Sequence, residues 1–453
     1  MKMNEAQASF LYLVGSVIQG LAISLVVPFA TRTLGVVEYG LAATSFSLIQ
    51  VMVIVAAAGL PLAITREYFG PSGAIGARVV VGLVCALSVF VGLVGLLVMW
   101  AGWSFAVAIA LIATAPLGVI AAVQAFLRAE LRAGWFVVLA VASSAGAQAL
   151  GLLTALIWHS AKIYLSTFCI VACVVASFAL LLVRPKMPWG HILTVRTALR
   201  IGLPILPHSL ALLLLSSGPV LLLAATAGSS QAGRYQALTL LVQGPISVLG
   251  ALNNVWVPTV LSAGEHKEIK ALARLVPRMI RFGSILSVGG GLLSCLATYL
   301  LVGTEFIPAS LVGPARLLPL SGVGYSLYLA ASTALFSVRK TWPMAIVTPI
   351  VVIICGLIAL PFARMADLLA IAAIQAFAYL LLGVGTTFAA RQMTSLGWSI
   401  RKVMISIILS VALVGLVGLT RTDALWRYSE AGLGIVFGIG LLRLIAHPAN
   451  DSN

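Results

Sequence analysis

The residues of this chain that could carry chemistry are arginines and uncharged polar side chains in or beside long apolar stretches. Arg32 and Arg66 each lie at the end of such a stretch, and Arg66 closes the proline-bearing segment GLPLAITR. Arginine binds phosphate through a forked pair of charge-assisted hydrogen bonds. Five further candidates could meet hydroxyl-rich groups: Gln50, Gln148, His208, Asn253 and Asn254. We predict that these seven residues contact a substrate.

Each candidate also has a structural interpretation that the sequence leaves open. Arginines at helix ends extend their charged groups toward water and follow the charge bias of membrane proteins. Amides inside apolar helices often bond neighbouring helices together. His208 follows Pro204 and Pro207, so its ring could bond a carbonyl freed by the kink.

No arrangement typical of an enzyme is visible in the sequence. There is no Cys-x-x-Cys pair, no His-x-x-x-His motif and no phosphate-binding loop. None of the eleven Asp and Glu residues falls inside a predicted span, whereas ion-coupled antiporters typically rely on buried acids. We therefore predict no catalytic residue, no metal and no cofactor.

Hydrophobic segments long enough to cross a bilayer fill the chain. The composition is 61% hydrophobic and 8% charged, with a mean hydropathy of +1.14. A helix needs about 20 apolar residues to span the hydrocarbon core. We predict an all-α integral membrane protein with about fourteen spans, at residues 10–30, 41–64, 79–100, 104–126, 135–158, 163–183, 201–226, 235–260, 282–302, 315–338, 343–362, 368–390, 403–419 and 431–445.

The distribution of basic residues predicts the orientation. With the N-terminus inside, 20 of the 27 Lys and Arg residues fall on the cytoplasmic side, as the positive-inside rule requires. This places both termini in the cytoplasm and the protein in the plasma membrane. The net charge of +16 is dispersed over short connections, which favours anionic lipid over nucleic acid as its partner.

The predicted spans divide into two halves. An N-terminal lobe (1–183) is followed by a cytoplasmic linker (184–200), a second lobe (201–390), and two further spans with a tail (391–453). A weak repeat supports this division, because Tyr39 precedes Pro61 by 22 residues and Tyr235 precedes Pro258 by 23. The linker and the segment 262–281 are both expected to form amphipathic helices at the membrane surface.

The segment from Val26 to Tyr68 resembles the opening of bacterial polysaccharide transporters of the multidrug/oligosaccharidyl-lipid/polysaccharide superfamily. The matching features are Arg-x-Leu-Gly, Tyr-Gly and Gly-Leu followed shortly by Arg, formed here by Arg32, Leu34, Gly35, Tyr39, Gly40, Gly59, Leu60 and Arg66. The second half shows similar features at Gly202-Leu203-Pro204, Gly233, Tyr235 and Trp256-x-Pro258. Where members often carry an Asp-Arg pair, this chain has Ser216-Ser217-Gly218-Pro219.

The resemblance implies two pseudo-repeated six-helix lobes plus two C-terminal helices. It also implies a flippase that moves an undecaprenyl-diphosphate-linked oligosaccharide or polysaccharide precursor to the outer leaflet by alternating access. Its partners would be that lipid-linked glycan, membrane lipids and enzymes of glycan assembly, with no role for nucleic acid. Two alternatives remain: export of drugs or small amphiphiles, and a non-transporting scaffold for glycan assembly.

Overall fold

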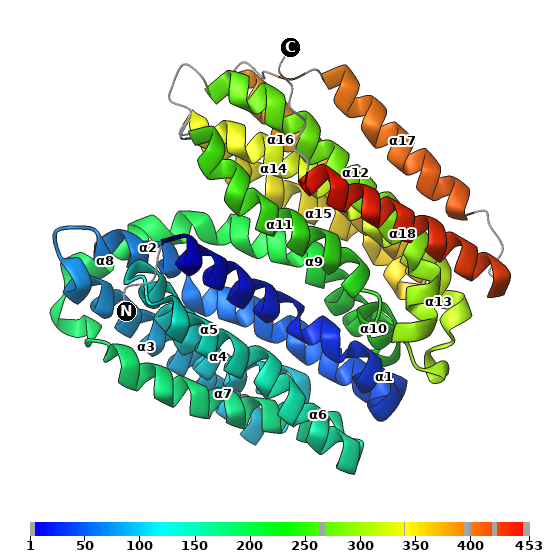
Figure 1. Ribbon diagram of the computed structural model, residues 1–453. Coiled ribbons are helices and arrows are strands. Elements are labelled where there is room, and N and C mark those ends of the chain that lie inside the picture. Colours follow the sequence, from blue (N-terminus) through cyan, green and yellow to red (C-terminus); the bar gives the residue numbers. More distant parts are fainter. Residues whose placement is uncertain are drawn as a thin grey trace. The chain divides into compact units, whose positions relative to one another are not determined.

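The protein is helical throughout the part of the chain that the structure describes. This computed structural model describes residues 5–261, 268–338, 340–393, 398, 400–418 and 424–446, and it contains no strand within those ranges. The chain forms two compact units, residues 1–236 and 237–453 (Figure 1). The predicted all-α membrane fold is confirmed.

Unit 1, residues 1–236, is built around a long first helix. Its helices are α1 (Glu5–Ala57), α2 (Leu60–Tyr68), α3 (Gly73–Trp100), α4 (Phe105–Ala129), α5 (Ala133–Val141), α6 (Ala147–Trp158), α7 (Ala161–Val183), α8 (Ile192–Gly202), α9 (Leu206–Thr226) and α10 (Ser229–Gln236). A π-helical turn, Ala142–Gly146, joins α5 to α6. Helices α4, α5, α9 and α10 all pack on α1.

Unit 2, residues 237–453, contains the remaining helices. They are α11 (Leu240–Leu261), α12 (Glu268–Leu301), α13 (Pro308–Leu317), α14 (Ser321–Ser337), α15 (Trp342–Arg364), α16 (Leu368–Met393), α17 (Ile400–Gly418) and α18 (Ala424–Ala446). Helix α14 packs on α16, and both α17 and α18 pack on α12 (Figure 1).

Over their described residues, the fourteen predicted spans fall on helices, with breaks at 58–59 and 237–239. Among the described residues, nine helices are long and apolar enough to cross a membrane, or ten if the broken pair α10 and α11 forms one span. The other four spans lie on the first part of α1, on the interrupted pair α13 and α14, and on α17 and α18. The chain is therefore a multi-pass membrane protein.

Two expected boundaries are wrong. The span predicted at 41–64 is interrupted at Ala58 and Gly59, because Pro61 lacks an N–H and is better placed in the first turn of a new helix, α2. The surface helix predicted at 262–281 is not separate. From Glu268 onward this segment is the first part of α12, which continues through Pro277 into the span. Residues 262–267 lie outside the described part.

The boundary between the two units falls after α10, because α9 and α10 pack on α1. The division into lobes on either side of residues 184–200 stays a prediction. The linker itself contains the expected amphipathic helix, which is α8.

The repeated sequence features mark two breaks between helices. Gly35 has a φ of 69° inside α1, and Gly228 has a φ of 88° between α9 and α10. Residues with side chains rarely adopt such angles, so glycine permits the chain to redirect at both points. Tyr39 and Tyr235, which follow the breaks, are both buried.

These two breaks meet inside unit 1. A Cβ atom added to Gly40 of α1 would lie 1.8 Å from the carbonyl oxygen of Ser229, and one added to Gly233 of α10 would lie 2.8 Å from the Cα of Gly40. The backbones of α1 and α10 therefore touch directly. Small residues allow such close approach between helices in membranes.

A second backbone contact fixes α8. A Cβ atom on Gly59, where φ is 69°, would lie 2.2 Å from the carbonyl oxygen of Gly202. The end of α8 is thereby held against the break that precedes α2. Ala198, also on α8, is fully buried in the apolar core of unit 1.

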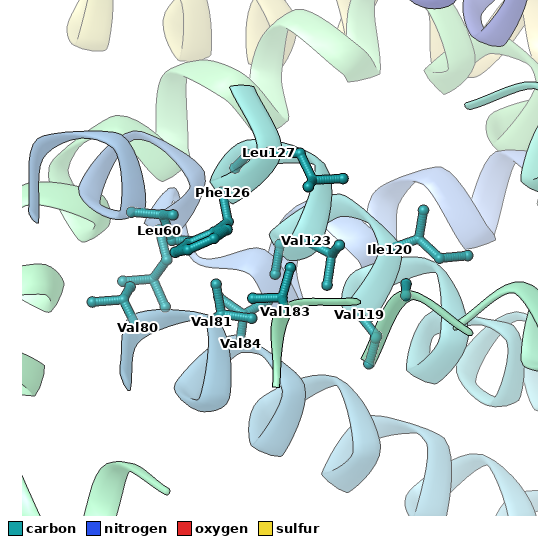
Figure 2. Packing of buried hydrophobic residues seen from close by; sticks show 14 of the residues in the cluster. Leu60, Val80, Val81, Val84, Val119, Ile120, Val123, Phe126, Leu127 and Val183 are labelled. Carbon is teal, nitrogen blue, oxygen red and sulfur yellow. The ribbon is translucent and has the colours of Figure 1, made fainter. Parts of the chain in front are cut away.

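That core forms where α2, α3 and α4 converge. Figure 2 shows the labelled side chains, with Phe126 of α4 lying toward Leu60 and Val81. All three are almost completely buried. Between helices in a membrane, such packing stabilises the fold through van der Waals contacts.

Substitution of a contact glycine tests this packing. We expect Gly40→Ala to lower the free energy of unfolding by about 2 kcal/mol or more, because the new methyl group would overlap the backbone of α10. The thermal midpoint of the purified protein in detergent measures the effect.

Gly134→Ala is the matched control, since nothing lies within 4 Å of a Cβ atom there. Alanine also favours a helix more than glycine does, so this variant should be neutral or slightly stabilised. Equal midpoints for the two variants would contradict the close contact.

Candidate functional site

Arg32 lies on an exposed surface of α1, three residues before the break at Gly35. Its Nη1 donates a hydrogen bond to the carbonyl oxygen of Pro28, one turn earlier in the same helix. Pro28 lies inside α1. The guanidinium is thus held along the helix and faces outward, where a ligand could reach it.

Arg66 lies in the last turn of the short helix α2 and is also exposed. Within the described ranges, its guanidinium makes no hydrogen bond or ion pair. Helix α2 is anchored on its other face by Leu60, Ala63 and Ile64, each with 0% of its surface exposed. A rigid helix therefore presents a charged group that is available to bind an anion.

Gln50 and His208 occupy intermediate positions. Gln50 is half-buried on the second part of α1, and His208 is half-buried in the first turn of α9. His208 interacts with another group within the protein. Both side chains keep part of their surface accessible.

In this conformation Gln148 forms a hydrogen bond that joins α6 to α7. Its Oε1 accepts a hydrogen bond from the hydroxyl of Tyr164 on α7, and only 1% of its surface is exposed. Gly151 makes room for the tyrosine, since a Cβ atom there would lie 2.5 Å from the Tyr164 ring. The structure thus brings Gln148 to Tyr164, whose importance the sequence did not indicate.

Aromatic rings extend this polar contact to α1. Phe46 meets the rings of Tyr164 and Phe168 edge to face, with centroids 5.6 and 5.1 Å away. Tyr39, Tyr164 and Gln236 line a cavity of about 10 Å³ beside Phe46. That volume is near the minimum for one water molecule, so this interior is packed and does not hold a large ligand.

Two predicted residues belong to unit 2. Asn253 is half-buried on α11, and its Oδ1 is buried without a hydrogen-bond partner within the described residues. The side chain of Asn254 lies outside the described residues. An unpaired buried amide oxygen is costly, because its capacity to accept a hydrogen bond is unused.

Unit 2 also contains a charged pair that the sequence analysis missed. Nη2 of Arg316 on α13 lies 2.9 Å from both carboxylate oxygens of Glu430 on α18. Each residue is only 3% exposed. Nearby, the Arg427 guanidinium lies over the ring of Tyr299, 4.0 Å from its centroid.

The sequence analysis did not predict a buried acid at Glu430, which lies one residue before the predicted span 431–445. Helix α18 begins at Ala424, seven residues before the predicted start of the span, and so includes this acid. Glu430 can be buried because Arg316 neutralises it across the helix contact. The feature of the sequence that could have indicated this burial is the position of Glu430 one residue before an apolar stretch.

A sequence model of the family described as "Polysaccharide biosynthesis protein" matches residues 6–263, which is more than half of the chain. No curated protein matches the chain in sequence.

Several solved structures share the fold at low sequence identity. The lipid II flippase MurJ in its inward closed conformation has a TM-score of 0.68 and 13% identity, covering 96% of this chain and 98% of that one. An inward-facing multidrug resistance transporter of the MATE family, in the MOP superfamily, has a TM-score of 0.58 and 14% identity, covering 89% and 99%. A MOP superfamily transporter from Pyrococcus furiosus, described as having a binding pocket of reverse polarity, has a TM-score of 0.54 and 14% identity, covering 91% and 96%.

The buried ion pair can be tested by a double-mutant cycle. We expect Arg316→Met to destabilise the protein by about 3–5 kcal/mol, because it leaves the Glu430 charge buried without compensation. Adding Glu430→Gln should restore most of that loss, since both charges are then removed. Thermal midpoints in detergent provide the measurement, and strictly additive losses in the double variant would show that the pair does not interact.

Proposed function

Because the chain belongs to the polysaccharide biosynthesis protein family, we propose that it is a flippase for a lipid-linked glycan. The cargo is an undecaprenyl-diphosphate-linked oligosaccharide or polysaccharide precursor, which moves from the inner to the outer leaflet by alternating access. The observation that carries this proposal is the family match over residues 6–263. The fold that the chain shares with a lipid II flippase supports it.

The physical task of such a protein is to lower a solvation barrier. Polar groups without hydrogen-bond partners are costly in hydrocarbon, and a charged diphosphate with several sugars is costlier still. A helical protein can supply a polar route for the headgroup while the polyprenyl chain stays in lipid. No chemical bond changes in this process, so the proposal assigns the chain no catalytic residue and no cofactor.

Arg32 and Arg66 are the proposed contacts for the diphosphate. Both guanidinium groups are exposed: Arg32 lies three residues before the break at Gly35, and Arg66 lies in the last turn of α2, the short helix that begins after the break at Gly59. Gln50, His208, Asn253 and Asn254 are proposed to meet the sugar hydroxyls. Gln148 is proposed to join them in a conformation that opens its bond to Tyr164.

The distribution of basic residues supports an orientation of the protein in the membrane. With 20 of 27 basic residues on one side, both termini are proposed to lie in the cytoplasm of a cell whose plasma membrane holds the protein. Arg66 then lies on the cytoplasmic side and Arg32 on the outer side. One guanidinium would receive the diphosphate and the other would accompany its release.

Export of drugs or other small amphiphiles is the second candidate. The fold shared with multidrug resistance transporters supports it. The two functions differ in the assay that detects them. An amphiphile exporter moves dyes or drugs in vesicles, whereas a glycan flippase is inactive toward them.

A scaffold for glycan-assembly enzymes would support glycan synthesis even when its own transport route is blocked by bulky side chains.

Replacement of the proposed diphosphate contacts provides the test. We expect Arg66→Ala and Arg32→Ala to lower glycan export at least tenfold in a deletion strain, because a charge-assisted bond to phosphate contributes about 1.5–3 kcal/mol. Lysine at either position should restore export only partly, since its ammonium group lacks the forked geometry. Lipid-linked precursor retained in the cytoplasmic leaflet is the quantity to measure.

Arg391→Ala is the matched control, because Arg391 is an exposed arginine on the predicted cytoplasmic side with no proposed role. All variants must reach the membrane in equal amounts. Export at the wild-type rate by both Arg66→Ala and Arg32→Ala would remove these residues from the site.

A further inference from the structure

The segment between α7 and α9 is held against the rest of unit 1 at two points. The backbone N–H of Lys186 donates to the carbonyl oxygen of Arg78, at 3.1 Å. A Cβ atom on Gly82 would lie 2.0 Å from the Lys186 carbonyl oxygen, so the two backbones are in contact. At the other end, Gly202 packs against the break at Gly59. The surface of α8 between these points is therefore preformed.

This segment exposes an unusual amount of apolar surface. Met187, Trp189, Ile192 and Leu193 are between 70% and 78% exposed. The segment follows α7 and leads directly into α9, with which α8 forms one continuous candidate span, Ile192–Thr226, so α8 lies at the end of a spanning helix. Apolar side chains with an exposed tryptophan at this depth are typical of helices that lie in the lipid interface.

An open, shallow hollow of about 610 Å³, which we call the α8 groove, lies along one face of α8 and the turn before α9, and all its lining residues fall between 192 and 204. Ile192, Val195, Leu199 and Leu203 give it an apolar lining that continues to Pro204. Two arginines, Arg196 and Arg200, line the same groove and are exposed. Because they are four residues apart, their side chains leave the helix on one face, with Cβ atoms about 5–6 Å apart.

The surroundings favour an anion. The chain contains no Asp or Glu between Glu130 and Glu265, so neither α8 nor α9 offers a carboxylate to the two arginines. Arg184 and Lys186 add two exposed cations just before α8. Among the helices that pack on α8, α2 carries one acid, Glu67, which is half-buried, and α3 carries none.

We propose that the α8 groove binds an anionic phospholipid of the cytoplasmic leaflet. Its phosphate lies between Arg196 and Arg200, and one acyl chain follows the apolar lining toward Leu203. The seven lining residues include no amide, hydroxyl or carboxylate that could recognise a sugar, which favours a membrane phospholipid over a glycan carrier as the occupant. The site is independent of the transported cargo.

The test measures lipid retention by the full-length protein. Purified protein in detergent is titrated with phosphatidylglycerol, and bound lipid is counted by native mass spectrometry. We expect Arg196→Ala/Arg200→Ala to weaken binding of the tightest phosphatidylglycerol roughly thirtyfold, because each cation at an anionic lipid surface contributes about a fivefold factor. Arg196→Lys/Arg200→Lys should retain most of the affinity, since attraction to a lipid surface depends on charge.

The double variant Arg391→Ala/Arg401→Ala is the control, because it removes the same charge from two exposed residues elsewhere. It should bind phosphatidylglycerol as the wild type does. Unchanged thermal midpoints in lipid-free detergent show that the variants are folded. Equal retention by the Arg196/Arg200 variant and this control would overturn the proposal.

A competition experiment identifies the occupant. Undecaprenyl phosphate is added to wild-type protein that already holds phosphatidylglycerol. We expect phosphatidylglycerol to remain bound at equal concentrations of the two lipids. Displacement by the polyprenyl lipid, abolished in Arg196→Ala/Arg200→Ala, would overturn the assignment and make the groove a site for the glycan carrier.

Discussion

Direct contact between helix backbones is the constraint on which the organisation of unit 1 depends. In lipid, no water is available to satisfy exposed amides and carbonyls, so breaks in helices survive only where protein surrounds them. The breaks at Gly35 and Gly228 belong to neighbouring elements that touch through Gly40 and Gly233. The same principle places Gly202 against the break at Gly59. Side chains at these points would separate the helices.

These contacts also determine which polar and charged side chains are exposed and which are buried. The break at Gly59 creates the short helix α2, and that helix carries Arg66 at its exposed end. The interior beside Tyr164, by contrast, is filled by aromatic rings and by a bond between helices. In unit 2, the buried charges of Arg316 and Glu430 are paired. Among the described residues, Arg32 and Arg66 are thus cations that stay exposed on helices held in place by these contacts.

The sequence predicts the all-α, multi-pass architecture and the approximate positions of the spans, because helix length and hydropathy are local properties of the chain. Glycine and tyrosine at matching positions, such as Gly35 and Tyr39, also indicate where helices break. The contact between Gly40 and Gly233 could not be predicted, because it joins residues 193 positions apart that no local pattern connects. The burial of Glu430 could not be predicted, because hydropathy does not reveal that Arg316, 114 positions away in the sequence, supplies a partner for its charge. The bond from Tyr164 to Gln148 likewise depends on tertiary packing.

Movement of a defined lipid by the purified protein tests the account most directly. Vesicles that contain the protein and an undecaprenyl-diphosphate-linked oligosaccharide, labelled in its sugar, are exposed to an enzyme that modifies the sugar only on the outer surface. The account predicts that the whole labelled pool becomes accessible in vesicles with the protein, whereas only the outer-leaflet fraction does so in protein-free vesicles. Equal accessible fractions in the two preparations, with correctly folded protein present, would contradict it.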